Sequence, residues 1–388
     1  MKTSSSPRRC AASPDGDPWL LTPGPLTTSS TVKRAMLRDY GSRDKDFIEL
    51  NARVLARLVA IVGGGADHVA VPLQGSGTFV VEAMLGCFVP PAGKVLICVN
   101  GAYGHRMARI CDYLKREYMI QESAEDTPTD LGLLDETLAR DPAITHVAAV
   151  YCETTSGILN PLAEIAERVA AHGRRLLIDA MSAFGALPLD SREIPFDAVV
   201  ASSNKCLQGA PGVGYCIASE SALAGTEGNS PSLSLDLYDQ WRAMQKNGQW
   251  RFTPPTHVLL AFDQALNEFD REGGVEGRGG RYRENCDILV AGMRAMGFRP
   301  LLPDPLQAPI IVTFHIPKNP KFRFAAFYDG LRDRGYVIYP GKLTVADSFR
   351  MGCIGHLDGA QMNGVLEAVR STLDALGIEG LVDSGGFD

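Results

Sequence analysis

The sequence lacks a long apolar run, a cysteine pair at C-x-x-C spacing and a cluster of basic residues. A transmembrane helix needs about 18 or more consecutive apolar residues, so no membrane segment is expected. The nine cysteines are scattered, and several, such as Cys87 and Cys98, lie in apolar runs, which favours buried reduced thiols over a disulfide scaffold. The net charge of −7 argues against a nucleic-acid surface. We therefore expect a soluble cytoplasmic protein without nucleic-acid or membrane partners.

The chain is long enough to build a large core, and its pattern changes near residue 271. Residues 1–18 carry positive charge but no apolar signal-peptide core, and we predict that they form a disordered N-terminal extension. Residues 19–270 are predicted to form a large domain. Residues 271–388, with helix and strand patterns in a different order, are predicted to form a smaller C-terminal α+β domain.

Apolar, strand-like runs alternate with amphipathic stretches in the larger domain, as in the predicted helix 161–173. The strand candidates are 68–75, 94–101, 145–153, 175–182, 196–203 and 213–219. Strands that are apolar on both faces are typical of a mostly parallel sheet covered by helices, so we predict an α/β fold. Residues 220–260, rich in Ser, Asp, Gln and Pro, are predicted to form an irregular excursion.

Polar residues follow several of these strands, and ligands of open parallel sheets bind at the carboxyl ends of the strands. The segment Gly75-Ser76-Gly77-Thr78 lies between a strand and a helix, which suits a phosphate but also an ordinary turn. Tyr103 follows the next strand, where its ring would stack on a planar ligand or fill a cleft wall. Glu153 to Ser156 follow a third strand and would line a pocket or cap the next helix.

Two charged residues complete this set. Asp179 ends the apolar strand RLLID, and a buried carboxylate needs a cationic or hydrogen-bonded partner. Lys205 follows VVASSN, and taken singly it is better explained as an ion-pair partner. Together, a phosphate loop, an aromatic ring, a buried aspartate and a strand-end lysine are the groups that a pyridoxal 5'-phosphate enzyme needs. Lys205 would form the Schiff base and carry protons, and Asp179 would keep the pyridine nitrogen protonated.

The ordered motifs GSGT, NGAYGHR, ETTSGILNP, DAMSAFGALP, SSNKCLQGAPGVG, WRFTPPTH and FRMGCIG resemble those of the class V, fold-type I aminotransferases. The resemblance covers roughly residues 19–375 and includes the opening LLTPGPLTTSS. It implies a homodimer with active sites at the subunit interface. Within the class, Tyr103 and Trp250 favour the phosphonate branch, because alanine–glyoxylate relatives carry tryptophan and tyrosine near these positions.

The resemblance also assigns roles to single residues. Lys205 and Asp179 match the catalytic pair, and Arg350 in FRMGCIG matches the arginine that binds the substrate anion. The positions matched to cofactor contacts are Ser76, Gly77, Thr78, Tyr103, Thr155, Asp179, Asn204, Lys205 and Thr253. Of these, Thr155 is expected near the ring's phenolic oxygen, Asn204 near the phosphate, and Thr253 at the phosphate of the neighbouring subunit.

The resemblance implies transfer of the amino group of 2-aminoethylphosphonate to pyruvate in a ping-pong cycle, giving phosphonoacetaldehyde and L-alanine. The nearest alternative is an alanine– or serine–glyoxylate aminotransferase, which would have almost the same anchoring groups. A desulfurase would need a reactive cysteine on a mobile loop, whereas Cys206 is expected to be buried and Cys353 to lie on a strand in the Arg350 segment. A non-catalytic binding module would be expected to lose Lys205 or Asp179. No metal site is predicted.

Overall fold

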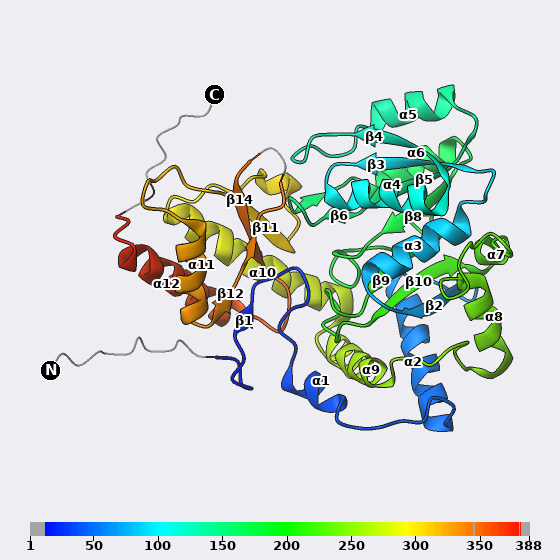
Figure 1. The fold of residues 1–388 in the computed structure, drawn as a ribbon, viewed down its shortest axis with the longest axis horizontal. Helices are drawn as coiled ribbons and strands as arrows, with labels where there is room; N and C mark the ends of the chain where they lie inside the picture. Colours follow the sequence, from blue (N-terminus) through cyan, green and yellow to red (C-terminus); the bar gives the residue numbers. More distant parts are fainter. Residues whose placement is uncertain (1–11, 344–345, 380, 382–388) are drawn as a thin grey trace.

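A computed structural model describes residues 12–343, 346–379 and 381, and the structural statements below concern these residues. Most of the extension predicted over residues 1–18 lies outside them. Its last part forms a turn whose Asp15 and Asp17 carboxylates lie 2.9 and 2.7 Å from Lys33 Nζ. Figure 1 shows a larger unit built on a wide sheet beside a smaller unit that contains α12 (Gly359–Ala375).

The larger unit contains the predicted, mostly parallel sheet, with seven strands in the order β2-β10-β9-β8-β5-β3-β4. In this sheet β10 runs antiparallel to β2 and β9, and the other neighbouring pairs are parallel. The strands are β2 (His68–Gln74), β3 (Lys94–Val99), β4 (Glu117–Glu122), β5 (Ile144–Val150), β8 (Arg175–Asp179), β9 (Ala198–Ser202) and β10 (Val213–Ser219). Every predicted strand is present, whereas the edge strand β4 was missed because it exposes polar residues such as Glu117.

Helices cover both faces of the sheet, because side chains of each strand point alternately to opposite sides. On β3, Leu96 packs into one buried cluster and Ile97 into the other. The first cluster includes residues of α2 (Lys45–Ile61), α5 (Leu131–Arg140), α6 (Leu162–Ala171) and α9 (Thr256–Arg271). The second includes residues of α3 (Gly77–Phe88), α4 (Ala102–Leu114), α7 (Glu220–Ala224) and α8 (Leu237–Asn247). Both sheet faces are therefore dry, as the apolar runs predicted.

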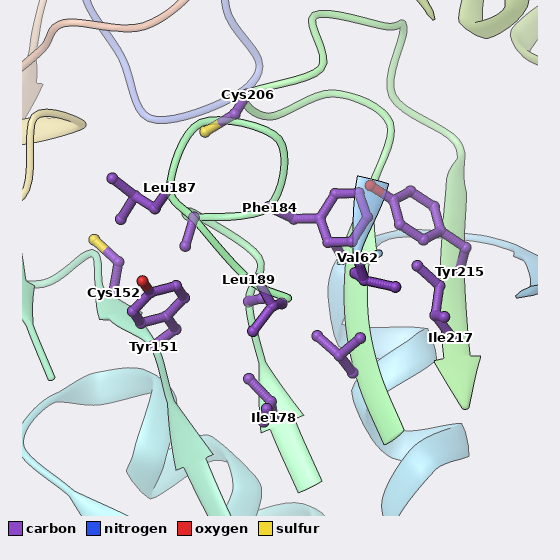
Figure 2. Close-up of a cluster of buried hydrophobic side chains, with 14 of the residues drawn as sticks. Val62, Tyr151, Cys152, Ile178, Phe184, Leu187, Leu189, Cys206, Tyr215 and Ile217 are labelled. Atoms are coloured by element: carbon purple, nitrogen blue, oxygen red, sulfur yellow. The ribbon is translucent and has the colours of Figure 1, made fainter. Parts of the chain in front are cut away.

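Part of the first cluster lies beneath the loop that follows β9. Figure 2 shows Cys206 at one edge of this cluster, together with Phe184, Leu187 and Tyr215. The Phe184 and Tyr215 rings meet edge to face, with centroids 5.3 Å apart. Cys206 is fully buried and directly follows Lys205, so core packing holds the backbone at that lysine.

The smaller unit has a three-stranded antiparallel sheet and an aromatic core. Its sheet order is β11 (Ile311–His315), β14 (Ser348–Gly352) and β13 (Tyr339–Pro340). Phe349 and Met351 of β14 pack into this core, and the alternation along the strand places Arg350 on the opposite face. Its helices are α10 (Gly274–Ala295), α11 (Phe324–Asp333) and α12, with the short helix η1 (Asp304–Leu306).

The N-terminal strand β1 (Trp19–Leu20) pairs in parallel with β12 (Tyr336–Val337) of the smaller unit. Trp19 and Leu21 are buried in the aromatic core of that unit. The first described strand thus lies far from the wide sheet, and the division of the chain at residue 271 stays a prediction. The remaining short elements are α1 (Ser30–Ala35), β6 (Cys152–Glu153) and β7 (Ile158–Leu159).

The prediction that residues 220–260 form an irregular excursion was wrong, because α7 and α8 lie within this range. Helix α8 begins after Asp236, whose side chain accepts a hydrogen bond from Asp239 N, and it ends at Gly248 in a left-handed conformation. Its apolar face buries Leu237 and Trp241. Among the described residues, no helix has both the length and the apolar character required to cross a membrane.

The two adjacent glycines of α10 provide a matched test of the packing between the units. A Cβ on Gly279 would lie 2.3 Å from the Ala186 carbonyl oxygen, whereas a Cβ on Gly280 would meet nothing within 4 Å. We expect Gly279→Ala to lower the free energy of unfolding by about 1–3 kcal/mol. Gly280→Ala should raise it by about 0.5–1 kcal/mol, because alanine favours helices. Urea unfolding of both variants measures the difference, and equal effects would contradict the close approach.

Candidate active site

A cavity of about 540 Å³ opens at the carboxyl ends of β2, β8 and β9. It is lined by Gly24, Pro25, Gly75, Ser76, Gly77, Thr78, Val81, Tyr103, Arg106, Asp179, Met181, Ser202, Asn204, Lys205, Pro211 and Gly212. The structure therefore brings together the predicted phosphate loop, the aromatic ring, the aspartate and the lysine, although they lie far apart in the sequence. The other predicted residues, Thr155, Thr253 and Arg350, do not line this cavity.

The Lys205 loop is fixed by hydrogen bonds from its own residues and from α10. Ser203 Oγ donates to the Ala210 carbonyl at 2.6 Å, and Gly209 N donates to the Ser203 carbonyl at 2.7 Å. From α10, Arg278 Nη1 and the Tyr282 hydroxyl donate to the Cys206 carbonyl at 2.5 and 3.1 Å. These bonds close a tight turn around Lys205 and leave its side chain directed into the cavity.

The Lys205 amine is held in a partly dehydrated position. Its Nζ donates to the Pro23 carbonyl at 2.9 Å. Burial lowers the pKa of Lys205 to about 8, and the nearby cations of Lys342 and Arg350 act in the same direction, whereas Asp179 opposes them. An amine with this pKa is partly neutral at mild pH, so it serves as a nucleophile and as a proton carrier.

Gly24 approaches Lys205 so closely that a larger residue would not fit. Gly24 has a φ of 125°, and a Cβ built on it would lie 2.6 Å from Lys205 Cδ and 2.9 Å from Nζ. The TPGP segment therefore forms one wall of the lysine channel. We did not identify Gly24 or Pro25 as site residues from the sequence, although the resemblance included this segment.

Asp179 ends β8 inside the cavity and is almost completely buried. Its Oδ1 accepts a hydrogen bond from Met181 N at 2.9 Å. Burial raises the pKa of Asp179 to about 6, and Glu153 also raises it, while the Met181 bond, Lys205 and Arg106 favour the ionised form. A carboxyl group in this state is suited to share a proton with a buried ring nitrogen.

The loop before α3 offers backbone donors to an anion. Ser76 is the N-cap residue, but its side chain makes no capping hydrogen bond and lines the cavity. A Cβ on Gly77 would lie 2.5 Å from Met181 Sδ, so a larger residue here would displace the end of the Met181 side chain, which also lines the cavity. The free N–H groups and the dipole of the helix N-terminus favour a phosphate here. Arg106 Nη1 donates to Thr78 Oγ1 at 3.2 Å and adds positive charge.

Tyr103 lies at the start of α4 and is held by Glu153. The Tyr103 N–H donates to Glu153 Oε2 at 3.1 Å. Thr155 donates to Oε1 of the same carboxylate through its hydroxyl at 2.6 Å and through its N–H at 2.9 Å. Burial raises the pKa of Glu153, while these hydrogen bonds favour its ionised form. Because Thr155 Oγ1 also accepts from Ala102 N at 3.1 Å, its predicted contact with the cofactor ring stays a prediction.

Arg350 lies on β14 close to this cluster and is almost completely buried. Its Nε donates to the Pro340 carbonyl at 3.2 Å, and its Nη1 donates to the Thr154 carbonyl at 3.0 Å. Backbone oxygens therefore orient the guanidinium without neutralising it. Thr253 is exposed outside the cavity of its own chain, and its predicted role requires a second subunit.

Sequence reasoning missed Arg106 and Lys342. The Arg106 guanidinium carbon lies 4.7 Å from the centre of the Tyr103 ring, and Lys342 Nζ lies 5.5 Å from it. Arg106 could have been predicted from the sequence, because residues three apart, such as Tyr103 and Arg106, lie on the same face of a helix. Lys342 comes from the smaller unit, and its position depends on how that unit packs.

The thiols near the site are not set up as nucleophiles. Cys206 is fully buried, as expected, and Cys353, which directly follows β14, is fully buried as well. Burial raises the pKa of Cys206 to about 12, and the Cys353 thiol pKa also lies above its usual range, because of its hydrogen bond with Cys286 and its burial. Among the described residues, no group of three or more His, Cys, Asp and Glu side chains is arranged to hold a metal ion.

Comparisons with known proteins agree on one family. The family model described as aminotransferase class-V matches residues 77–322. The 2-aminoethylphosphonate–pyruvate transaminase of Pseudomonas aeruginosa is 53% identical over 359 residues, covering 92% of this chain and 97% of that protein. These findings confirm the resemblance inferred from the motifs.

Solved structures confirm the fold. A pyridoxamine–pyruvate aminotransferase from Mesorhizobium loti has a TM-score of 0.86 and 25% identity, and the match covers 95% of both chains. An alanine–glyoxylate aminotransferase from Nostoc sp. has a TM-score of 0.85 at 22% identity, covering 92% of this chain and 95% of that one. At 22% identity, the similarity to the alanine–glyoxylate aminotransferase concerns the fold only. The α/β fold-type I architecture predicted from the sequence is thus present.

The lowered pKa of Lys205 is measurable by its reactivity. Reductive methylation of the apoprotein, quantified by mass spectrometry, should show Lys205 labelling that rises around pH 8. Asp179→Asn should move this midpoint to lower pH, because removing the carboxylate destabilises the nearby ammonium. Exposed Lys45 in the same sample is the internal control. A Lys205 profile that coincides with that of Lys45, or an upward shift in Asp179→Asn, would contradict this electrostatic account.

Gly24→Ala should push the Lys205 amine out of its dehydrated position. The amine would regain water and a higher pKa, so its labelling near pH 8 should slow by about tenfold or more. Gly16→Ala is the matched control, because Gly16 also has a positive φ, 82°, but nothing lies within 4 Å of its added Cβ. If Lys205 is labelled at the wild-type rate in both variants, the close approach of Gly24 does not determine the pKa of the amine.

Proposed function

The chain belongs to the class V aminotransferases, and from this membership we propose that it transfers the amino group of 2-aminoethylphosphonate to pyruvate. The products are phosphonoacetaldehyde and L-alanine. The observation that carries the proposal is the convergence of Lys205, Asp179 and the anion-binding loop on one cavity. The substrate pair comes from the Pseudomonas aeruginosa relative, which is 53% identical across almost its whole length.

The cavity fits pyridoxal 5'-phosphate, which we propose as the cofactor. Ser76, Gly77 and Thr78 would bind the phosphate at the N-terminus of α3, with Asn204 nearby. Tyr103 would pack against the ring, and Asp179 would pair with its nitrogen. When bound, the cofactor withdraws electrons from the carbon that carries the substrate amine. The buried carboxyl group of Asp179, with its raised pKa, suits a partner that brings a proton of its own.

Lys205 is the proposed catalytic base. Its amine would bond to the cofactor aldehyde in the resting enzyme and would be released when the substrate amine replaces it. The free amine would then be placed to take a proton from the substrate carbon that bears nitrogen and to hold it for the return transfer. The lowered pKa of Lys205, about 8, leaves a substantial neutral fraction for this step. The loop bonds to α10 keep the amine in place while it moves the proton.

Arg350 is proposed to bind the acidic group of both substrates in turn. The planar guanidinium pairs with two oxygens of a phosphonate or of a carboxylate, so one arginine serves both half-reactions. Its carbonyl contacts to Pro340 and Thr154 orient it without supplying a competing anion. Because the amine donor and the keto acid would use this same cation, they should compete for the enzyme.

The glyoxylate alternative has less support. The alanine–glyoxylate aminotransferase structure shares the fold at 22% identity, whereas the phosphonate relative is 53% identical. The desulfurase alternative lacks a reactive thiol, since Cys206 and Cys353 are buried with raised pKa values. A non-catalytic module is not favoured either, because Lys205 and Asp179 are both present in the cavity.

We further propose a cytoplasmic homodimer with the active sites at its interface. Thr253 is exposed outside its own cavity, where a neighbouring subunit would receive it. Phe79 and Phe252 lie close in sequence to the phosphate loop and to Thr253, and their side chains are about half exposed, at 50% and 51%. Burying such apolar rings against a second subunit would stabilise the assembly.

The visible spectrum of the cofactor-loaded protein tests the donor directly. 2-Aminoethylphosphonate without a keto acid should abolish the band of the lysine-bound cofactor, and pyruvate should restore it. Lys205→Ala, which cannot bond to the cofactor, is the control for the band. If L-alanine or serine abolishes the band and the phosphonate does not, the donor is wrong and a glyoxylate-type aminotransferase takes its place.

A further inference from the structure

Three cations surround Tyr103 without a carboxylate partner. The Arg106 guanidinium carbon and Lys342 Nζ lie 4.7 and 5.5 Å from its ring centre. Burial raises the pKa of Tyr103, and the charges of Arg106 and Arg350 oppose this shift. In the described part of the chain, no aspartate or glutamate forms an ion pair with Arg106, Lys342 or Arg350. Glu153 is nearby, but the backbone and Thr155 occupy its oxygens. Such a local excess of positive charge favours an anionic ligand.

The three cations have different surroundings. Arg106 donates to Thr78 of the phosphate loop, so it belongs to the cofactor side of the cavity. Arg350 is buried and held by two backbone carbonyls. Lys342 is mainly exposed and has no hydrogen bond to another described residue, and its ammonium rests beside Tyr103. It is therefore the cation that is free to move toward a ligand.

We infer that Lys342 is the second cation of the substrate's anion site and that it favours a phosphonate dianion over a carboxylate. This inference rests on the proposed function. Lys342 lies beside Tyr103, and Arg350 is close enough for its charge to act on Lys342, so the two cations could bind one acidic group together. Burial lowers the pKa of Lys342, and the charges of Arg350 and Arg106 lower it further. Burial also lowers the pKa of Arg350. Such shifts are expected where several cations lie close together around a site for one anion.

Charge and shape explain the preference. Arg350 pairs with two oxygens and neutralises one negative charge, which satisfies a carboxylate. A phosphonate has a third oxygen and, above its second ionisation, a second negative charge. Lys342, a compact charge on a flexible stem, is suited to bind that remaining oxygen. A carboxylate offers no further charge, so it gains little from the lysine.

The experiment compares two unreactive ligands of matched length on the cofactor-loaded protein. 2-Hydroxyethylphosphonate and 3-hydroxypropionate lack the amine, and calorimetry above the second ionisation of the phosphonate gives their affinities. Lys342→Met should weaken binding of the phosphonate by about 10- to 100-fold and that of the carboxylate by less than about threefold. Lys342→Arg should restore most of the phosphonate affinity. Lys318→Met, which removes an exposed lysine elsewhere in the smaller unit, should change neither.

Kinetics provide the second readout. Lys342→Met should raise the 2-aminoethylphosphonate concentration needed for half-maximal bleaching of the cofactor band and leave the limiting rate nearly unchanged. If the wild type reacts with this donor but Lys342→Met weakens both ligands equally, or neither, the inference is wrong and the proposed function stands. If the wild type does not react with the donor, both fall. Retained binding of the carboxylate shows that the variant is folded.

Discussion

The dehydration of one amine is the constraint on which the site depends. Water stabilises an ammonium strongly, so a lysine is kept in a dry channel only if the backbone around it cannot yield. Here Cys206 is packed in the core below the loop, and Arg278 and Tyr282 hold the carbonyl of the same residue from α10. Gly24 closes the channel from the other side. The rigid loop allows Lys205 to remain reactive, with a pKa of about 8.

The acidic and the basic side chains around this amine have different partners. Asp179 lines the cavity and Glu153 is buried beside Tyr103, and each carboxyl group accepts hydrogen bonds from backbone N–H groups. Arg106 and Arg350 lie toward the positions where phosphate and substrate anions would bind, and they are oriented by a hydroxyl and by carbonyls. Because neither cation forms an ion pair with a carboxylate of the described residues, their charge remains available to ligands. The fold thus provides carboxyl groups that would stabilise a bound cation and, separately, guanidinium groups that would bind anions.

Contacts between the two units fix the positions of these groups relative to one another. Arg350 comes from the smaller unit but donates to the carbonyl of Thr154, which follows β6 of the larger unit. Gln208, in the Lys205 loop, donates to the Gly355 carbonyl beyond β14. Close approach of α10 to Ala186, which requires Gly279, joins the units further. One continuous set of contacts, rather than separate loops, therefore positions the Arg350 guanidinium and the Lys205 amine, the proposed substrate-binding group and catalytic base.

The sequence by itself determined the local structure and the chemistry of the strand ends. Apolar runs predicted each central strand, and topology requires that parallel strands place their carboxyl-end residues, such as Asp179 and Lys205, at one edge. It did not reveal β4 or α8, because an edge strand exposes polar residues and a short amphipathic helix resembles a polar loop. Only tertiary structure decided that Gly24 lines the cavity and that Lys342 lies beside Tyr103, since distance between segments depends on packing and leaves no periodic signal in the sequence.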